Sequence, residues 1–293
     1  QIYTLSLHDA LPISGERGLQ NAMKKYGGFD HNIQSLKIMT KLESHYPEFE
    51  GLNLSWETIE GTVKHNGPIK KINNGYLKEY NKKFDLELKQ FPNLEAQVAA
   101  IADDIAYLNH DIDDGCRAEM FSLEQLRELP FIDKIIHDFE NKHCVLDQNL
   151  KIYAVTRNMI ARMVFDALDN SKANLKRLKI RSHEDAPKQK IFTVDFSDQM
   201  KTEIAQLHVF LKEHFYTNTQ VARMDMKSQR IVEELFALFT SDWKLLPEEV
   251  RSRLSPCSKD AEIADAVCTY IANMTDMNAV EEHRKLYDVH TRF

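Results

Sequence analysis

The run between Asn93 and Gly115 constrains the fold most, because it contains neither Gly nor Pro. Asn is a favoured residue at the start of a helix and Gly just after its end, so this run predicts one long helix. An apolar stripe recurs along it at helical spacing, formed by Val98, Ile101, Ile105, Leu108 and Ile112. We therefore expect this helix to be buried on more than one side.

Composition favours helices in the rest of the chain as well. Nine Gly and eight Pro among 293 residues are too few for an all-β protein with many tight turns. Further helices are expected over residues 31–43, 55–66, 122–129, 131–139, 149–179, 197–215, 218–240, 247–253, 260–274 and 278–287. KIFTVDFS, residues 190–197, is the one strand-like run and predicts a small β-hairpin or edge strand. The predicted fold class is all-α, and no internal repeat or linker divides residues 15–293 into separate domains.

Bulk properties exclude several classes of protein. The four cysteines have no metal-ligand spacing, so they are interpreted as free thiols in a reducing compartment. No run approaches the roughly 18 apolar residues that a membrane span needs, and the mean hydropathy is −0.47. The formal charge of −7 argues against wholesale nonspecific binding of nucleic acid. We expect a cytoplasmic protein that does not contact a membrane.

Residues 1–14, QIYTLSLHDALPIS, do not resemble the rest of the chain. They have neither a basic start nor a continuous apolar stretch, so they are not a secretory signal. They resemble a translated sequencing adapter and show no helix that leads naturally into Gly15. We treat them as non-native and assign no metal role to His8 and Asp9, since the flanking residues are unlike a metal motif.

Three polar side chains share one face of the long helix. Asp103, Tyr107 and Asp111 are spaced four residues apart and form a continuous row. Small residues upstream, at Ala96 and Ala99, would let a neighbouring backbone approach, so the row is expected to face a packed interior. A buried carboxylate is costly unless it binds a metal or another cation, and Asp is a suitable oxygen ligand for a divalent ion. The alternative, acids on a solvated face, stays open on spacing alone.

Four blocks of the chain resemble one known family. They are GGFDHNIQSLKIMTKLE (27–43), GLNLSWETIEGTVKHNGP (51–68), EAQVAAIADDIAYLNHDIDDG (95–115) and IADAVCTYIANMTDMNAVEEHRKLYD (263–288). In this order and spacing they resemble the bacterial dGTPase-like triphosphohydrolases of the HD-domain superfamily. The last block departs from the family, since residues 274–279 are MTDMNA where the family tends to have MTDRYA. That departure casts doubt on any substrate or interface role carried there.

The resemblance implies a fold, a reaction and three roles. It implies an HD-domain helical bundle with a C-terminal helical extension, in which an H…HD…D set holds a divalent metal such as Mg²⁺ or Mn²⁺. The family hydrolyses a dNTP to a deoxynucleoside and inorganic triphosphate. Asp103 resembles the last metal-ligating aspartate, Tyr107 the tyrosine that packs on the sugar, and Asp111 the acid near the sugar 3′-hydroxyl. A homo-oligomer is also implied.

The resemblance further implies that much of the metal site lies upstream of Gly15. Glu16 matches the acid that follows the family's catalytic His by three residues and helps to orient it, and that His would stand at the position of Ile13. Three of the four metal ligands would also precede Gly15. We therefore expect the chain as written to bind metal poorly and to turn over little, whereas the full-length protein would be the active enzyme.

Four more residues are candidates for substrate binding. Lys64, His65 and Asn66, in VKHNGP, resemble a family block, although a helix C-terminus favours Lys and His on dipole grounds alone. Arg157 is a candidate for the triphosphate because guanidinium suits bidentate phosphate contacts, with a surface or structural Arg as the alternative.

Two other functions compete with dNTP hydrolysis. One is an HD phosphohydrolase acting on monophosphates or cyclic nucleotides. The other is a catalytically silent protein that binds nucleotides or single-stranded nucleic acid, supported only by a basic run at Lys172, Lys176, Arg177, Lys179, Arg181, Lys188 and Lys190.

Overall fold

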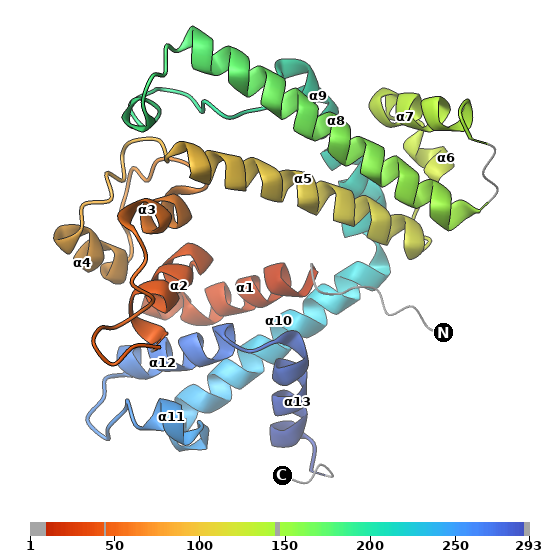
Figure 1. Cartoon of the computed structure of the whole chain (residues 1–293). Helices are drawn as coiled ribbons and strands as arrows, with labels where there is room; N and C mark the ends of the chain where they lie inside the picture. Colours follow the sequence, from red (N-terminus) through yellow and green to blue (C-terminus); the bar gives the residue numbers. More distant parts are fainter. Residues whose placement is uncertain (1–9, 44, 144–146, 290–293) are drawn as a thin grey trace. The chain divides into compact units, whose positions relative to one another are not determined.

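The computed structural model of the chain describes residues 10–43, 45–143 and 147–289. Over these residues it contains helices and connecting segments and no β-strand, which confirms the all-α prediction (Figure 1). The helices divide into two compact units. Unit 1 comprises Leu54–Ile72 and Tyr80–Asn218, and unit 2 the described residues before Leu54, Asn73–Glu79 and the chain from Thr219 onward. Helix α4 (Gly75–Lys83) crosses the boundary between them.

Unit 1 is built around two long helices, α5 (Leu94–Arg117) and α8 (Gln148–Arg177), which pack against each other (Figure 1). Shorter elements complete it: α3 (Trp56–Lys64), α6 (Leu123–Leu126), α7 (Pro130–Glu140), the 3₁₀ turn η3 (His183–Asp185), α9 (Asp198–Leu211) and the π-helical turn η4 (Lys212–Tyr216). Its core includes Leu108, Ile132, Met159 and Leu211, each nearly or fully buried. Burial of such side chains contributes about 1.5–3 kcal/mol each.

The predicted N-terminus of α5 is confirmed, and it ties α5 to α3. Asn93 Oδ1 accepts a hydrogen bond from Ala96 N at 2.8 Å, while Asn93 Nδ2 donates to Glu60 Oε2 at 2.6 Å. Gly61 of α3 lies directly against Ala96, and a Cβ at Gly61 would come within 2.9 Å of the Ala96 Cβ. These small residues let the two helix backbones approach closely, as the sequence suggested for Ala96.

The predicted β-hairpin at 190–197 is wrong. The backbone N–H groups of this segment bond to side chains instead of to a neighbouring strand. Gln97 Oε1 of α5 accepts from Thr193 N and Val194 N at 2.8 and 3.0 Å, and Asp166 Oδ2 of α8 accepts from Ser197 N at 2.9 Å. The segment is therefore a loop held against α5 and α8, because polar side chains of those helices accept hydrogen bonds from its backbone N–H groups.

Unit 2 has its own core. Helix α1 (Ala10–Ala22) packs along α10 (Thr219–Ser241), and α12 (Asp260–Ala272) and α13 (Asp276–Tyr287) also contact α10. The remaining elements are η1 (Met23–Tyr26), α2 (His31–Lys37), η2 (Ile38–Leu42), η5 (Trp243–Leu245) and α11 (Glu248–Arg251). Buried side chains from α1, α10 and α12, such as Leu19, Leu235 and Val267, form this core.

Two sequence-based expectations for the start of unit 2 have different outcomes. The start of the helix expected from residue 31 is confirmed, since Gly27 and Gly28 before it have positive φ and Asp30 caps α2. The expectation that residues 1–14 contain no helix leading into Gly15 is wrong for residues 10–14, which belong to α1. Pro12 stands in the first turn of α1, where a helix does not need its missing N–H. Residues 1–9, including His8 and Asp9, lie outside the described part of the chain.

Candidate functional site

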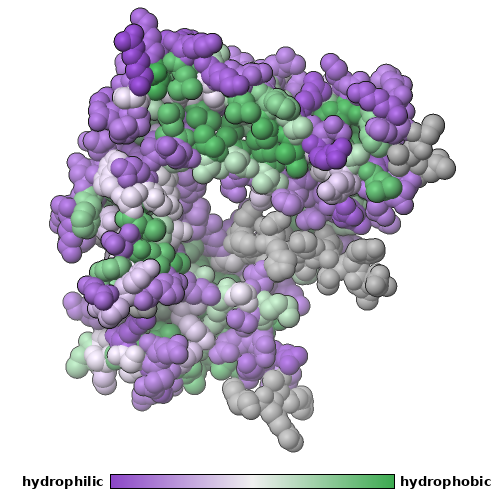
Figure 2. Space-filling model, viewed as in Figure 1, coloured by the Kyte–Doolittle hydropathy of each residue, from purple (hydrophilic) through white to green (hydrophobic). Residues whose placement is uncertain are grey.

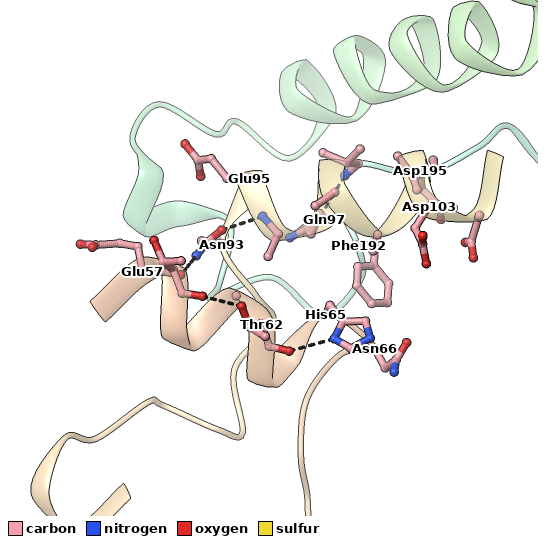
Figure 3. Close-up of a pocket in the computed structure, with 18 of the residues that line it drawn as sticks. Glu57, Thr62, His65, Asn66, Asn93, Glu95, Gln97, Asp103, Phe192 and Asp195 are labelled. Atoms are coloured by element: carbon pink, nitrogen blue, oxygen red, sulfur yellow. Dashed lines mark hydrogen bonds between the residues drawn. The ribbon is translucent and has the colours of Figure 1, made fainter. Parts of the chain in front are cut away.

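Unit 1 contains a cavity of about 980 Å³ beside the first half of α5. Its walls come from α3 and the residues just after it, the N-terminal half of α5 and the segment from η3 to the start of α9 (Figure 3). The polar residues that line it include Glu57, Thr62, His65, Asn66, Glu95, Asp103, Asp104, His183 and Asp195. This volume is in the range of small-molecule sites.

The cavity brings together three residues that the sequence singled out. His65 and Asn66 lie at the end of α3, and Asp103 lies on α5 (Figure 3). His65 Nδ1 donates to Thr62 O at 2.8 Å, which fixes the orientation of its ring. Asp103 lines the cavity but is exposed, so the expectation that it faces a packed interior is wrong. Within unit 1, its side of α5 borders an open cavity and not another helix.

Acidic groups dominate the charge of this cavity. None of the described residues that line it is Lys or Arg, whereas five are Asp or Glu. Partial removal from water and the like charge of Asp103 raise the pKa of Asp104, and His208 opposes the shift. Negative charge of this density repels an anionic ligand such as a triphosphate unless a cation is bound with it.

The wall formed by the segment from η3 to Phe196 was not identified from the sequence as part of a site. Phe192 packs on Gly67, where a Cβ would come within 3.2 Å of the Phe192 Cζ, and its ring meets Phe91 edge-on with centroids 5.0 Å apart. His183, on η3, lines the same cavity. The only sequence signal for this wall was the apolar run that we assigned to a hairpin.

A second polar cluster lies farther along α5. Asp111 is buried, with 3% of its surface exposed, and Tyr107 is half-buried. Tyr216, from η4, donates a short hydrogen bond from its hydroxyl to Asp111 Oδ2. Its side chain also forms a hydrogen bond with Tyr107. The predicted row thus separates into two parts. Asp103 is exposed at the cavity, whereas Tyr107 and the buried Asp111 are joined through Tyr216, which was not predicted from the sequence.

Two other candidates have local partners. Lys64 is fully buried, with its Nζ 2.5 Å from Glu60 Oε1 and 3.1 Å from Glu87 O, and it does not line the cavity. Glu16, in unit 2, lies 2.9 Å from His31 Nδ1 and accepts from Gln20 Nε2 at 3.0 Å. Ile13, the position expected for the catalytic His, belongs to α1, and its side chain lies outside the described part of the structure.

Arg157 faces a different groove. This groove, of about 760 Å³, runs between α5 and α8, and its lining is mainly apolar. Figure 2 shows hydrophobic side chains gathered over these two helices. Val98, 52% exposed, contributes to the groove, so the expectation that the whole apolar stripe of α5 is buried is wrong at this residue. Arg157 and Asp103 therefore line separate hollows.

The donors in the cavity suit a divalent cation chemically, since carboxylate oxygens are the ligands that Mg²⁺ prefers. In the described part of the chain, however, no group of three or more His, Cys, Asp or Glu side chains is arranged to hold a metal ion. Asp103 and its described neighbours do not by themselves complete such a site.

Comparison with known proteins extends over nearly the whole chain. The Deoxyguanosinetriphosphate triphosphohydrolase-like protein of Caulobacter sp. (strain K31) is 40% identical over 286 residues, which cover 96% of this chain and 72% of that protein. Proteins of the same name from Brucella canis and Rickettsia bellii are 41% and 37% identical over 96% and 95% of the chain. The chain belongs to this family.

The family is also recognisable in the C-terminal part of the chain. The family described as Phosphohydrolase-associated domain matches residues 194–285, which run from the wall of the cavity through α13. The HD-type resemblance inferred from the four sequence blocks is thereby confirmed. Among the described helices, none is both long and apolar enough to cross a membrane.

Proposed function

We propose that the full-length protein hydrolyses a deoxynucleoside triphosphate, with dGTP as the first candidate, to a deoxynucleoside and inorganic triphosphate. The observation that carries this proposal is that Asp103, His65 and Asn66 line one cavity of about 980 Å³ in a chain of this family. The names of the relatives support the substrate class. The proposed cofactor is a divalent metal, Mg²⁺ or Mn²⁺.

The candidate residues would have separate roles. We propose that Asp103 is one ligand of the metal, which when bound would neutralise phosphate charge and activate water. Asn66 would donate a hydrogen bond to the nucleotide from the α3 side of the cavity, and His65, whose Nδ1 donates to Thr62 O, would accept one at Nε2. Tyr107 would pack on the sugar and Asp111 would accept from its 3′-hydroxyl. Glu16 would orient the catalytic His.

The carboxylates of the cavity would also enforce a dependence on cations. Because five acids and no Lys or Arg are among the described residues that line it, a free triphosphate would be repelled, and the nucleotide would bind as its metal complex. We do not assign substrate contacts to Lys64 or Arg157, since the first is paired with Glu60 and the second lines the apolar groove. The protein would act in the cytoplasm as a homo-oligomer.

The test compares this chain with an extended form. In the extended form, the segment encoded upstream of residue 15 in the source genome stands in place of residues 1–14. Each is incubated with dGTP and Mg²⁺ or Mn²⁺, and products are separated by anion-exchange chromatography. We expect the extended form to release deoxyguanosine and intact triphosphate in equal amounts, and this chain to release little. Release of phosphate or pyrophosphate would overturn the proposal.

A second candidate function is binding without catalysis. It is favoured by the exposed basic side chains at the end of α8 and after it, which include Lys172, Lys176, Arg177, Lys179 and Arg181. If the extended form hydrolyses no dNTP but binds a single-stranded oligonucleotide tightly at physiological salt, this candidate replaces the first.

A further inference from the structure

Asp111 is a carboxylate that the fold has removed from water. Only 3% of its surface is exposed, and a buried carboxylate without partners would be strongly destabilising. Tyr216 is one of its partners, and the Tyr216 hydroxyl donates to Asp111 Oδ2. These residues are 105 positions apart in the sequence, and they bring α5 and η4 into direct polar contact.

The turn that carries Tyr216 departs from α-helical geometry, and this departure directs the Tyr216 side chain toward Asp111. After α9 the backbone widens into the π-helical turn η4, which closes with Thr217 N donating to Lys212 O at 3.2 Å. Phe215, the preceding residue, is buried against Phe121, with ring centroids 6.4 Å apart. A π-turn shifts the helical register by one residue, and such turns recur at functional sites. Here it places Phe215 in the core and Tyr216 on Asp111.

Tyr216 also joins Asp111 to Tyr107. The side chains of Tyr216 and Tyr107 are hydrogen-bonded, so one hydroxyl links both residues to which we assign sugar contacts. Burial, together with Asp111, raises the pKa of Tyr216 above its ordinary value, so the phenol stays protonated and remains a donor. A carboxylate offers about four acceptor sites, so a single hydrogen bond from Tyr216 orients the group without using all of them.

We propose that Tyr216 is a positioning residue for recognition of the sugar. It holds the Asp111 carboxylate and the Tyr107 phenol in the orientation that meets the 3′-hydroxyl of the nucleotide. This inference rests on the proposed function and adds to it a determinant of sugar specificity from outside the four sequence blocks. Tyr216 does not contact the substrate itself.

The test uses Tyr216→Phe in the extended protein, with dGTP and 2′,3′-dideoxyGTP as substrates. Without the phenol hydroxyl, Asp111 loses its fixed orientation, and its contact with the 3′-hydroxyl weakens. We expect the ratio of kcat/KM for dGTP over dideoxyGTP to fall about tenfold, mainly through a higher KM for dGTP, as a lost hydrogen bond of about 1.4 kcal/mol would give. Tyr153→Phe, at a tyrosine of α8 that is 62% exposed, is the matched control and should keep the ratio.

A purely structural role for Tyr216 predicts a different result. It would lower the melting temperature and impair both nucleotides equally, so an unchanged ratio in Tyr216→Phe overturns the inference. If that variant does not fold, Asp111→Asn, which keeps the side-chain volume and Tyr216, is expected to show the same fall, and an unchanged ratio there is equally decisive. If the unsubstituted extended protein hydrolyses neither nucleotide, the proposed function has failed, which is a separate outcome.

Discussion

Lys64 Nζ lies 2.5 Å from Glu60 Oε1, one helical turn away on α3, and neither side chain has more than 1% of its surface exposed. The ammonium group also donates to Glu87 O and Phe91 O, at 3.1 and 3.4 Å. This pair stands beneath the wall of the cavity that carries His65. We therefore expect the pair to hold the end of α3 in place, whereas the sequence had suggested contact of Lys64 with substrate.

Lys64→Ala should destabilise the protein strongly, because it leaves the Glu60 carboxylate buried without its counter-ion. The expected loss in the free energy of unfolding is about 3–5 kcal/mol, measured by urea denaturation. The double variant Glu60→Gln/Lys64→Met should recover part of this loss, and Lys70→Ala, at an exposed lysine nearby, should have no effect. A Lys64→Ala protein of normal stability but weakened nucleotide affinity would contradict this role.

Asp103→Asn should reduce triphosphate release by the extended protein at least about a hundredfold, because it would remove the charge of the proposed metal ligand. Its melting temperature should change little, since Asp103 is exposed. Asp169→Asn serves as control, because the Asp169 side chain is 81% exposed on α8 and does not line the cavity. Equal activity in the two variants would exclude Asp103 from the reaction.

Arg157→Ala should leave kcat and KM for dGTP within about twofold of the unsubstituted protein. Arg157 lines the apolar groove between α5 and α8 and not the cavity that contains Asp103. Steady-state kinetics over a range of dGTP concentrations decide the matter. A rise in KM of tenfold or more would show that Arg157 binds the triphosphate after all.

The free energy of unfolding should fall in acid, because the ion-pair cluster of Glu140, Lys151 and Arg127 is lost. Hydrogen bonds from Lys151 and Arg127 lower the pKa of Glu140 from 4.5 to about 2. Because the folded-state pKa is the lower one, the cluster stabilises the fold above pH 4.5, and that contribution disappears as the pH falls toward 2. Glu140→Gln should lower the melting temperature at pH 7 but not at pH 2, and high salt should weaken the difference. An equal effect of Glu140→Gln at both pH values would contradict this assignment.

Helix boundaries were predictable because their determinants are local. Asn93, Ser55 and Asp30 each accept a hydrogen bond from a backbone N–H within three residues, so a short stretch of sequence specifies each start. The shared face of Asp103 and Tyr107 likewise follows from helical period. Which of these side chains is buried depends on other elements, and the sequence interpretation was wrong for Asp103 for that reason.

The features that were missed depend on contacts between distant residues. Tyr216 reaches Asp111 only because a π-turn shifts its register, and composition carries no signal for such a turn. The 190–197 segment has the alternation of a strand, yet Gln97, 96 positions from Thr193, supplies its backbone with an acceptor. Pattern alone does not distinguish a strand from a loop whose amides are satisfied by side chains.

The attachment of that loop has a consequence for how the pocket can diversify. Because Gln97 of α5 accepts from Thr193 and Val194, and side chains of α8 bond the same segment, side chains hold the wall that carries Phe192, and no strand pairing must be preserved. Residues between η3 and α9 can therefore be exchanged, and the cavity reshaped, without altering the helix on which Asp103 stands. The shape of this wall and the geometry of α5 are thus separate structural variables.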